Sequence, residues 1–464
     1  MVFSSLLFLF WFIPVFFTVY YLVPARLRNT ALFLGSIVFY AWGEPSYLLL
    51  IFASIIVNWG AGVMMAWSCS DRHDMPRVRK LIFAAALIYD FGMLFVFKYT
   101  GFFVANINAV FGNILRDPGF TLPLGISFYT FQIASYIIDL YRGRIDAEKN
   151  ILTLGAYLVM FPQLIAGPIV VYSQVSEKLH ERRITWQAVS DGITIFVFGL
   201  ASKVLIANNA GALWNDLEAI GYANISMPLA WLGVIAYTLQ IYFDFNGYSL
   251  MAIGLGSMLG FTIPRNFDHP YISRSLTEFW RRWHITLSGW FREYVYIPLG
   301  GNRKGKIRTY VNLFIVWFLT GFWHGAGWNF ICWGMFFFVF LTLEKSFLSG
   351  FLERHTVFSR IYSLLLIGLS WMIFAITDFT QLGVYMTRLF SPQAAADCRD
   401  AVYYLRNYGT VIVLGCIFST PSASRWFDGL ESKTARCGIV LILLFASVCF
   451  LADAAYNPFL YFRF

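Results

Sequence analysis

Residues 277–328 read TEFWRRWHITLSGWFREYVYIPLGGNRKGKIRTYVNLFIVWFLTGFWHGAGW, the densest basic and aromatic cluster in the chain. Two of the six histidines, His284 and His324, lie within this stretch. Its polar, glycine-containing middle is flanked by apolar runs, which is the pattern of a loop between membrane-embedded helices. The rest of the chain has the composition of a membrane scaffold around it.

The amino-acid composition is that of a membrane protein. The 464 residues are 59% hydrophobic and 13% charged, with a mean hydropathy of +0.64, whereas a soluble domain is about a quarter charged. These values predict an all-α polytopic protein, organised as a single domain over residues 1–464 in a lipid bilayer. The net charge of +9 does not indicate nucleic acid, because the Lys and Arg residues occupy short loops, where they act as topology signals. The six cysteines show no C-x-x-C spacing and predict neither a disulfide framework nor a metal site.

The apolar runs predict roughly a dozen transmembrane helices, with re-entrant or interfacial helices among them. The first run, residues 2–23, lacks a basic flank and a cleavage site, so we interpret it as a spanning helix rather than a signal peptide. The later runs lie at about residues 29–42, 47–67, 81–97, 124–141, 151–169, 193–208, 227–241, 249–263, 310–322, 330–348, 361–376, 408–418 and 439–454.

The charges of the loops test this order of crossings. If every run crosses and the N-terminus lies outside, the basic loops 142–149 and 265–308 are inside and the loop 242–248 is outside, as the positive-inside rule requires. Residues 177–183 are the exception, because they are rich in charge and yet fall outside. Either they form an interfacial helix, or one of the short runs does not cross.

The loop at residues 265–308 carries nine basic side chains against three acidic ones. The ordinary explanation is a topology anchor with interfacial tryptophans. The alternative is a docking surface for an anionic cytosolic donor such as an acyl-coenzyme A, because arginine recognises phosphate groups. The candidates for contact with such a donor are Trp280, Arg281, Arg282 and Trp283.

The two histidines are the candidate catalytic residues. In a continuous helix, Trp280, His284 and Ser288 share one face. The apolar run after Arg308 reaches His324 in about 16 residues, or ~24 Å of helix, which is past the bilayer midplane, and the following Gly-Ala-Gly allows the helix to break. A titratable group inside a membrane indicates a functional site, and an imidazole suits general-base work. A hydrogen-bonded structural histidine is the alternative at each position.

Short motifs spread over almost the whole chain give a resemblance to a known family. They are MVFSSLLFLF at 1–10, FYAWGEP at 39–45, FKY at 97–99, PLGISFYTFQ at 123–132, FPQLIAGP at 161–168, YFDFNGYS at 242–249, FWRRWH at 279–284, YIPLGGN at 296–302, WHGAGW at 323–328 and YFRF at 461–464. Each motif is weak alone, but their number and order are specific. The chain resembles the membrane-bound O-acyltransferases, and among them the bacterial alginate and peptidoglycan O-acetyltransferases.

The resemblance implies a helical core with a central channel and an acyltransferase reaction. It makes His324 the family's invariant histidine and His284 its second polar position. It implies acetyl-CoA as the cytosolic donor, no permanently bound cofactor and no metal, and a place in the bacterial cytoplasmic membrane. The implied acceptor is an extracytoplasmic polysaccharide, alginate-like or peptidoglycan, reached through an extracytoplasmic SGNH-type acetyltransferase partner. Leu250 departs from the family pattern, which often has Asp there, so no acidic role is assigned at that position.

Five further residues are candidates for lining the channel. They are Trp323, Asn329, Asp244, Gln132 and Gln163. Asp244 and Asn329 are expected near an outer funnel. The two glutamines lie inside apolar runs, where they either line the channel or form interhelical hydrogen bonds.

Three other functions compete with acetyl transfer. D-alanyl transfer from a carrier protein is the alternative within the enzyme class. A transporter for a lipid-linked sugar predicts intramembrane charge pairs and two similar halves, but no internal repeat is evident. A non-catalytic scaffold that recruits an extracellular acetylase leaves His324 without a role.

Overall fold

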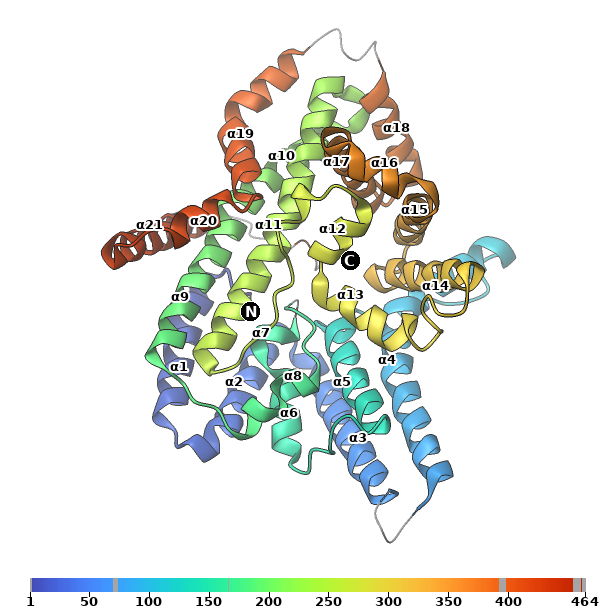
Figure 1. The fold of residues 1–464 in the computed structure, drawn as a ribbon, viewed down its shortest axis with the longest axis vertical. Coiled ribbons are helices and arrows are strands. Elements are labelled where there is room, and N and C mark those ends of the chain that lie inside the picture. The colour runs from blue at the N-terminus through green and yellow to red at the C-terminus, as the bar shows by residue number, and fades with distance from the viewer. Residues whose placement is uncertain (1, 70–73, 166, 392–397, 454–459, 461–464) are drawn as a thin grey trace. The chain divides into compact units, whose positions relative to one another are not determined.

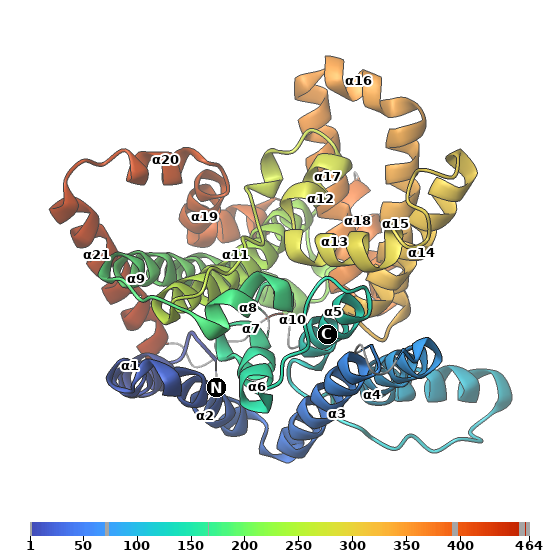
Figure 2. The ribbon, with the colours of Figure 1, turned by 60° about the horizontal axis from the view of Figure 1, so that its bottom comes forward.

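The computed structural model describes the chain except residues 1, 70–73, 166, 392–397, 454–459 and 461–464 (Figure 1). The YFRF motif at 461–464 therefore lies outside the described residues. In the described part every regular element is a helix, which confirms the all-α prediction (Figure 1, Figure 2). Seven of these helices are long and apolar enough to cross a membrane, and a shorter apolar helix covers Phe8–Leu22. The protein is therefore a multi-pass membrane protein.

The described chain divides into two compact units. Unit 1 comprises Met1–Ile193 and Ala252–Pro264, and unit 2 comprises Thr194–Met251 and Arg265–Phe464. Two long helices, α9 (Trp186–Ala201) and α11 (Met227–Leu259), contribute residues to both units. The prediction that the chain acts as one domain stays a prediction.

Unit 1 combines two helical stretches of membrane-spanning length, Pro45–Trp67 and Pro76–Phe111, with several shorter helices. Besides its parts of α9 and α11, unit 1 contains η1 (Phe8–Phe12), α1 (Ile13–Leu22), η2 (Ala25–Leu27), α2 (Arg28–Gly43), η3 (Pro45–Tyr47), α3 (Leu48–Trp67), α4 (Pro76–Phe111), α5 (Ile126–Tyr141), α6 (Ile151–Val159), α7 (Phe161–Leu164) and α8 (Tyr172–His180). Helices α3 and α4 lie side by side (Figure 1, Figure 2). Asn58 Nδ2 donates to Asp90 Oδ1 over 2.8 Å between them, and both side chains are buried.

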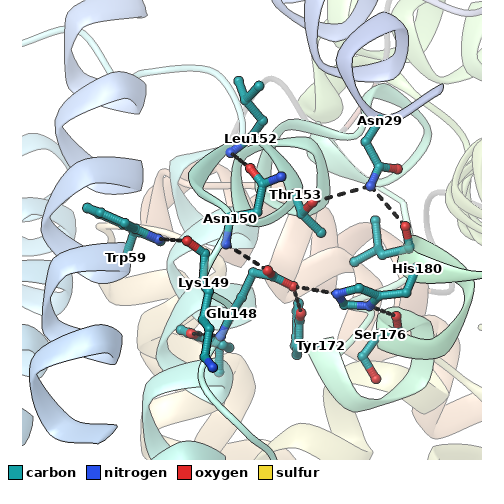
Figure 3. A network of polar contacts seen from close by, with 12 residues as sticks. Asn29, Trp59, Glu148, Lys149, Asn150, Leu152, Thr153, Tyr172, Ser176 and His180 are labelled. Carbon is teal, nitrogen blue, oxygen red and sulfur yellow. Dashed lines mark hydrogen bonds and ion pairs between the residues drawn. The ribbon is translucent and has the colours of Figure 1, made fainter. Parts of the chain in front are cut away.

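The apolar run at 151–169 does not cross the membrane. Helix α6 has nine residues, or ~14 Å, and the chain then turns back through α7. Glu148, before α6, accepts from the Tyr172 hydroxyl over 2.7 Å and lies 3.1 Å from His180 Nε2, at the end of α8 (Figure 3). Both flanks of the run therefore lie at one end of unit 1, and the predicted crossing is wrong because the helix is too short to span. This removes the charge exception at residues 177–183.

Unit 2 contains the stretch with the two histidines. Its other elements are η4 (Ser202–Ala207), α10 (Asn208–Ile220), η5 (Tyr222–Asn224), η6 (Pro270–Ile272), α12 (Leu276–Arg282), α13 (Ile285–Phe291), η7 (Arg292–Tyr296), α14 (Lys306–His324), α15 (Trp328–Leu343), η8 (Glu344–Leu348), α16 (Ser349–Arg354), α17 (Thr356–Ala375), α18 (Phe379–Phe390), α19 (Arg399–Phe418), α20 (Ser422–Asp428) and α21 (Lys433–Asp453).

Helix α11 corrects a second part of the predicted topology. The sequence predicted two spans, 227–241 and 249–263, with an outside loop between them, but α11 is continuous over 33 residues. The Asn-Gly pair inside it does not break the helix, because apolar side chains on both sides keep the segment buried. A continuous helix leaves no loop at 242–248, so the predicted outside loop is wrong.

Helices α14 and α15 form a hairpin whose backbones touch. A Cβ added at Gly334 would lie 2.4 Å from the carbonyl oxygen of Trp317, and one at Gly321 would lie 2.4 Å from that of Phe330. Only glycine permits this approach. The hairpin fixes the end of α14, where the predicted helix break after His324 is confirmed.

Candidate functional site

His284 lies in a sharp break between two short helices. Helix α12 ends at Arg282 and α13 begins at Ile285, and His284 between them has a φ of 44° and no exposed surface. The predicted continuous helix that places Trp280, His284 and Ser288 on one face is therefore wrong. A non-glycine residue in this left-handed conformation is uncommon and marks a position held by its surroundings.

Asn266 holds His284 and fixes its tautomer. The backbone N–H of Thr286 donates to Asn266 Oδ1 over 3.3 Å, so that atom is the amide oxygen. His284 Nδ1 lies 3.1 Å from the same oxygen and therefore carries the proton. The backbone of Asn266 also accepts from Ile285 N over 2.9 Å. Because Nδ1 is the donor, Nε2 of the neutral ring presents a bare lone pair.

The Nε2 atom of His284 is buried and has no hydrogen-bond partner among the described residues. The ring lies edge-on to Phe245, with 4.7 Å between centroids, so its surroundings are apolar. Complete burial lowers the pKa of His284 to about 3. The imidazole is therefore neutral at physiological pH, and Nε2 is available as a hydrogen-bond acceptor.

His324 is the last residue of α14 and is 6% exposed. Three aromatic rings enclose it: Trp323, Trp333 and Phe374, at centroid distances of 5.0, 4.9 and 5.5 Å. The segment of residues 325–327 leads directly into α15, and a Cβ on Gly325 would lie 2.1 Å from the Phe330 ring. The imidazole thus sits in an aromatic cage at a helix terminus.

Trp323 joins the surroundings of the two histidines. Its ring lies 6.1 Å from that of His284 and 5.0 Å from that of His324, centroid to centroid, and it is 2% exposed. The two imidazoles, 40 residues apart in the sequence, thus contact one indole within unit 2. The sequence predicted all three as site residues, but it did not predict that Trp323 is the common neighbour of the two histidines.

The other two predicted tryptophans lie in the aromatic core of unit 2. Trp280 packs edge-on against Trp317 at 4.7 Å and Phe337 at 4.9 Å. Trp283 packs against Phe267 and Trp371, each at 4.9 Å. Both are buried. They pack the end of α12 against α14, α15 and α17.

The two predicted donor-binding arginines have different environments. Arg282 is half-buried and bonded, with Nε 3.0 Å from Glu278 Oε1 and Nη1 3.1 Å from Asp268 Oδ2. Arg281 is exposed. The remaining basic side chains of the loop are exposed as well; they are Arg265, Arg274, Arg292, Arg303, Lys304, Lys306 and Arg308. The loop therefore presents exposed guanidinium and ammonium groups, and Arg282 is not one of them.

Sequence reasoning missed two residues that position this region, Asn266 and Glu344. Glu344 is 2% exposed and accepts from Leu276 N over 2.6 Å and from Thr277 N and Oγ1 over 3.0 and 2.7 Å. A buried carboxylate at the start of α12 matches the helix dipole. Neither residue lies near its partner in the sequence, and no local motif indicates the contact.

Asp244 and Asn329, predicted near an outer funnel, make structural contacts. Asp244 lies inside α11, not in a loop, where it pairs with Lys203 and accepts from Leu460 N over 2.7 Å. Its predicted loop position is wrong because α11 is continuous. Asn329 Nδ2 donates to the carbonyl of Phe374 over 3.1 Å, which ties α15 to the end of α17.

Gln132 and Gln163 are both fully buried in unit 1. Gln163 Nε2 donates to the carbonyl of Tyr157 over 2.7 Å, and the Tyr157 hydroxyl lies 3.3 Å from the carbonyl of Gln132. Neither side-chain polar atom of Gln132 has a partner among the described residues. No group of three His, Cys, Asp or Glu side chains gathers in the described part in a way that would hold a metal ion.

Comparisons with known proteins agree with this architecture. Residues 148–387 match the membrane-bound O-acyltransferase family. A probable alginate O-acetylase of Pseudomonas putida is 37% identical, over 100% of both chains. A peptidoglycan O-acetyltransferase of Helicobacter pylori is 34% identical, over 81% of this chain and 77% of the relative. A teichoic acid D-alanyltransferase of Bacillus subtilis is more distant, 30% identical over 48% of this chain and 59% of the relative.

The family match covers both histidines, Asn266 and Glu344, and the full-length relative extends the likeness over both units. The chain belongs to the membrane-bound O-acyltransferase family and is an O-acetyltransferase.

Proposed function

We propose that this enzyme takes an acetyl group from cytosolic acetyl-CoA and passes it through the bacterial cytoplasmic membrane to a hydroxyl of an extracytoplasmic acceptor, with His324 as the catalytic base. The names of the relatives support an alginate-like polysaccharide or peptidoglycan as the final acceptor. An extracytoplasmic SGNH-type acetyltransferase that receives the group first is part of the proposal. The observation that supports it is the pair of buried imidazoles that both lie next to the Trp323 indole.

The reaction needs one proton acceptor that works at neutral pH. The acceptor oxygen attacks the thioester carbonyl carbon, and its proton moves to a neutral ring nitrogen of His324. Collapse of the tetrahedral intermediate breaks the C–S bond, and the leaving sulfur takes the proton back from the imidazolium as coenzyme A is released. An ester forms and no other reactant is consumed. The aromatic cage around His324 excludes water, which protects the thioester from hydrolysis.

His284 has a different part in this scheme. Its Nδ1–H is held by Asn266, and its low pKa makes Nε2 a weak base. A neutral Nε2 lone pair accepts a hydrogen bond from an N–H or O–H of the bound donor or acceptor other than the attacking hydroxyl, whose single proton goes to His324, and so orients that molecule. The exposed basic side chains of residues 265–308 offer contacts for the phosphates of the donor. The proposal assumes a channel that joins the donor side to the acceptor side, as the family resemblance implies.

The test is acetyl transfer from labelled acetyl-CoA by the purified protein in proteoliposomes. We expect H324A to lower turnover at least about a hundredfold, the usual contribution of a general base. The matched control is H355A, because His355 is exposed in the loop between α16 and α17; it should keep wild-type activity. Near-wild-type turnover in a folded H324A protein would contradict the assignment.

A second candidate, D-alanyl transfer, is less well supported because its named relatives match only about half of the chain. The same assay with a D-alanyl carrier thioester separates the two. Transfer of D-alanine in preference to acetate would replace the proposed donor while leaving the role of His324 intact.

A further inference from the structure

A second polar region lies in unit 1, where three segments meet at one corner. Asn29 Nδ2 donates to the carbonyl of Leu179 over 2.9 Å and lies 3.3 Å from Thr153 Oγ1 (Figure 3). The hydroxyl of Tyr20 donates to the carbonyl of Leu259 over 2.8 Å. These bonds bring the segment from the end of α1 to the start of α2, the end of α8 and the end of α11 together. Two arginines, Arg28 and Arg182, stand next to these contacts in the sequence.

Arg182 reaches into this corner rather than into solvent. Its guanidinium carbon lies 4.7 Å from the ring centroid of Phe261 and 5.6 Å from that of Tyr20. Burial lowers its pKa from the usual value, a hydrogen bond with the Tyr20 hydroxyl partly opposes this, and the positive charge of Arg28 adds to the lowering. The two guanidinium groups are therefore close enough to repel each other.

No acidic group balances this pair of charges. In the part of the chain that the structure describes, neither Arg28 nor Arg182 forms an ion pair with a carboxylate. Nε of Arg28, and Nε and Nη1 of Arg182, are buried and have no hydrogen-bond acceptor among the same residues. The nearby Glu148 is bonded to Tyr172 and His180, and Glu177 is exposed. Buried donors of this kind are costly unless an anion meets them.

The surface beside the pair faces lipid. In η1 and α1, Trp11, Val15 and Leu22 are 69%, 60% and 79% exposed, and Trp186, at the start of α9, is 87% exposed. Exposed apolar side chains on a membrane protein meet acyl chains, and a tryptophan with flanking Arg marks the interface. These features are typical of the membrane interface, where the lipid phosphates lie. Helix α2 also begins at Arg28 without a side-chain cap, which favours an anion there.

We propose that Arg28 and Arg182 form a binding site for the phosphate of an anionic phospholipid in the leaflet on the basic side of the membrane. Two planar guanidinium groups suit the tetrahedral phosphate oxygens. The site lies in unit 1, whereas the histidines lie in unit 2, so it does not depend on the proposed reaction. Soluble phosphate compounds share the same chemistry, and the experiment separates them from lipid.

The experiment titrates phosphatidylglycerol into the purified protein in phosphatidylcholine–detergent micelles and follows the thermal unfolding temperature. We expect phosphatidylglycerol to stabilise the wild type, and R28Q and R182Q each to weaken its apparent affinity about tenfold, the loss of one charged hydrogen-bonding group. The matched controls are R26Q and R183Q, because both side chains are exposed neighbours with the same charge. They should bind within about twofold of the wild type.

Two results would overturn the proposal. If all four variants respond to phosphatidylglycerol like the wild type, the site is elsewhere. If inorganic phosphate or coenzyme A gives the same stabilisation at matched concentration, and R28Q and R182Q abolish it, the ligand is a soluble anion and not a lipid. Because R182Q also removes packing against Tyr20 and Phe261, R28Q decides the outcome if R182Q does not fold.

Discussion

The substitution H284N isolates the effect of burying one imidazole. Asparagine adopts the left-handed conformation found at residue 284 more easily than most residues, and its amide nitrogen takes the place of Nδ1 as donor to Asn266 Oδ1. It has no counterpart of Nε2 and no titration. The variant should therefore fold like the wild type while losing the pH response of this one group.

The expected magnitude follows from the pKa values. The pKa of His284 is about 3 in the folded protein and about 6.5 in an unfolded chain. Between these values the unfolded chain binds a proton that the folded protein does not, so the contribution to stability is complete above pH 6.5 and is lost as the pH falls. From pH 7 to pH 5 the loss is about 2 kcal/mol.

The assay is denaturant unfolding in detergent micelles at pH 7 and pH 5, followed by tryptophan fluorescence. The other five histidines are the same in both proteins, so the difference between the two pH responses belongs to His284. The wild type should lose about 2 kcal/mol more than H284N over this interval. Equal losses in the two proteins would show that His284 is not buried in a neutral form, and would refute both the pKa argument and the role assigned to Nε2.

Three further substitutions test the scaffold of unit 2. G334A should cost about 1–3 kcal/mol of stability through overpacking against the α14 carbonyl, whereas G350A, which meets no atom within 4 Å, should be neutral or slightly stabilising; equal effects in thermal unfolding would contradict the close helix contact. E344A should lower stability by about 2–4 kcal/mol, because it leaves buried N–H groups at the start of α12 without an acceptor; E344Q, which keeps an acceptor, should cost less. K203M removes the ion-pair partner of the buried Asp244 and should lower the free energy of unfolding by about 3–5 kcal/mol. The double variant K203M/D244L should recover most of that stability. Failure to recover it would show that the two groups are not coupled.

Much of the fold could be predicted from composition and periodicity, because a bilayer requires long apolar helices and places basic loops on one side. The errors have a common physical cause. The nine-residue helix α6 is as apolar as a spanning helix, and the Asn-Gly pair inside the continuous helix α11 has the composition of a loop. Only tertiary packing decides whether the first crosses the membrane and whether the second continues as a helix. Hydropathy reports burial in an apolar medium and does not report whether that medium is lipid or protein.

The candidate site shows a similar division. His324 could be predicted because an imidazole before a glycine-rich break in an apolar run is locally unusual. The break at His284 could not, since FWRRWHITLSG has an ordinary helical pattern and the left-handed residue is imposed by Asn266 and Thr286. The role of Asn266 depends on a contact across 18 positions of sequence, and no periodic pattern records such a contact.

In a library randomised at position 284, three requirements act on this residue in turn, and the first is its left-handed backbone. Selection for membrane expression alone retains residues that tolerate this conformation, chiefly Gly, Asn, Asp and His. Selection for a side chain that donates a hydrogen bond to Asn266 Oδ1 then removes Gly and Asp, which have no such donor. Selection for acetyl transfer leaves only the residue that adds an acceptor at the position of Nε2. The order in which variants disappear from such a library therefore separates what the backbone, the hydrogen bond and the reaction each require of one side chain.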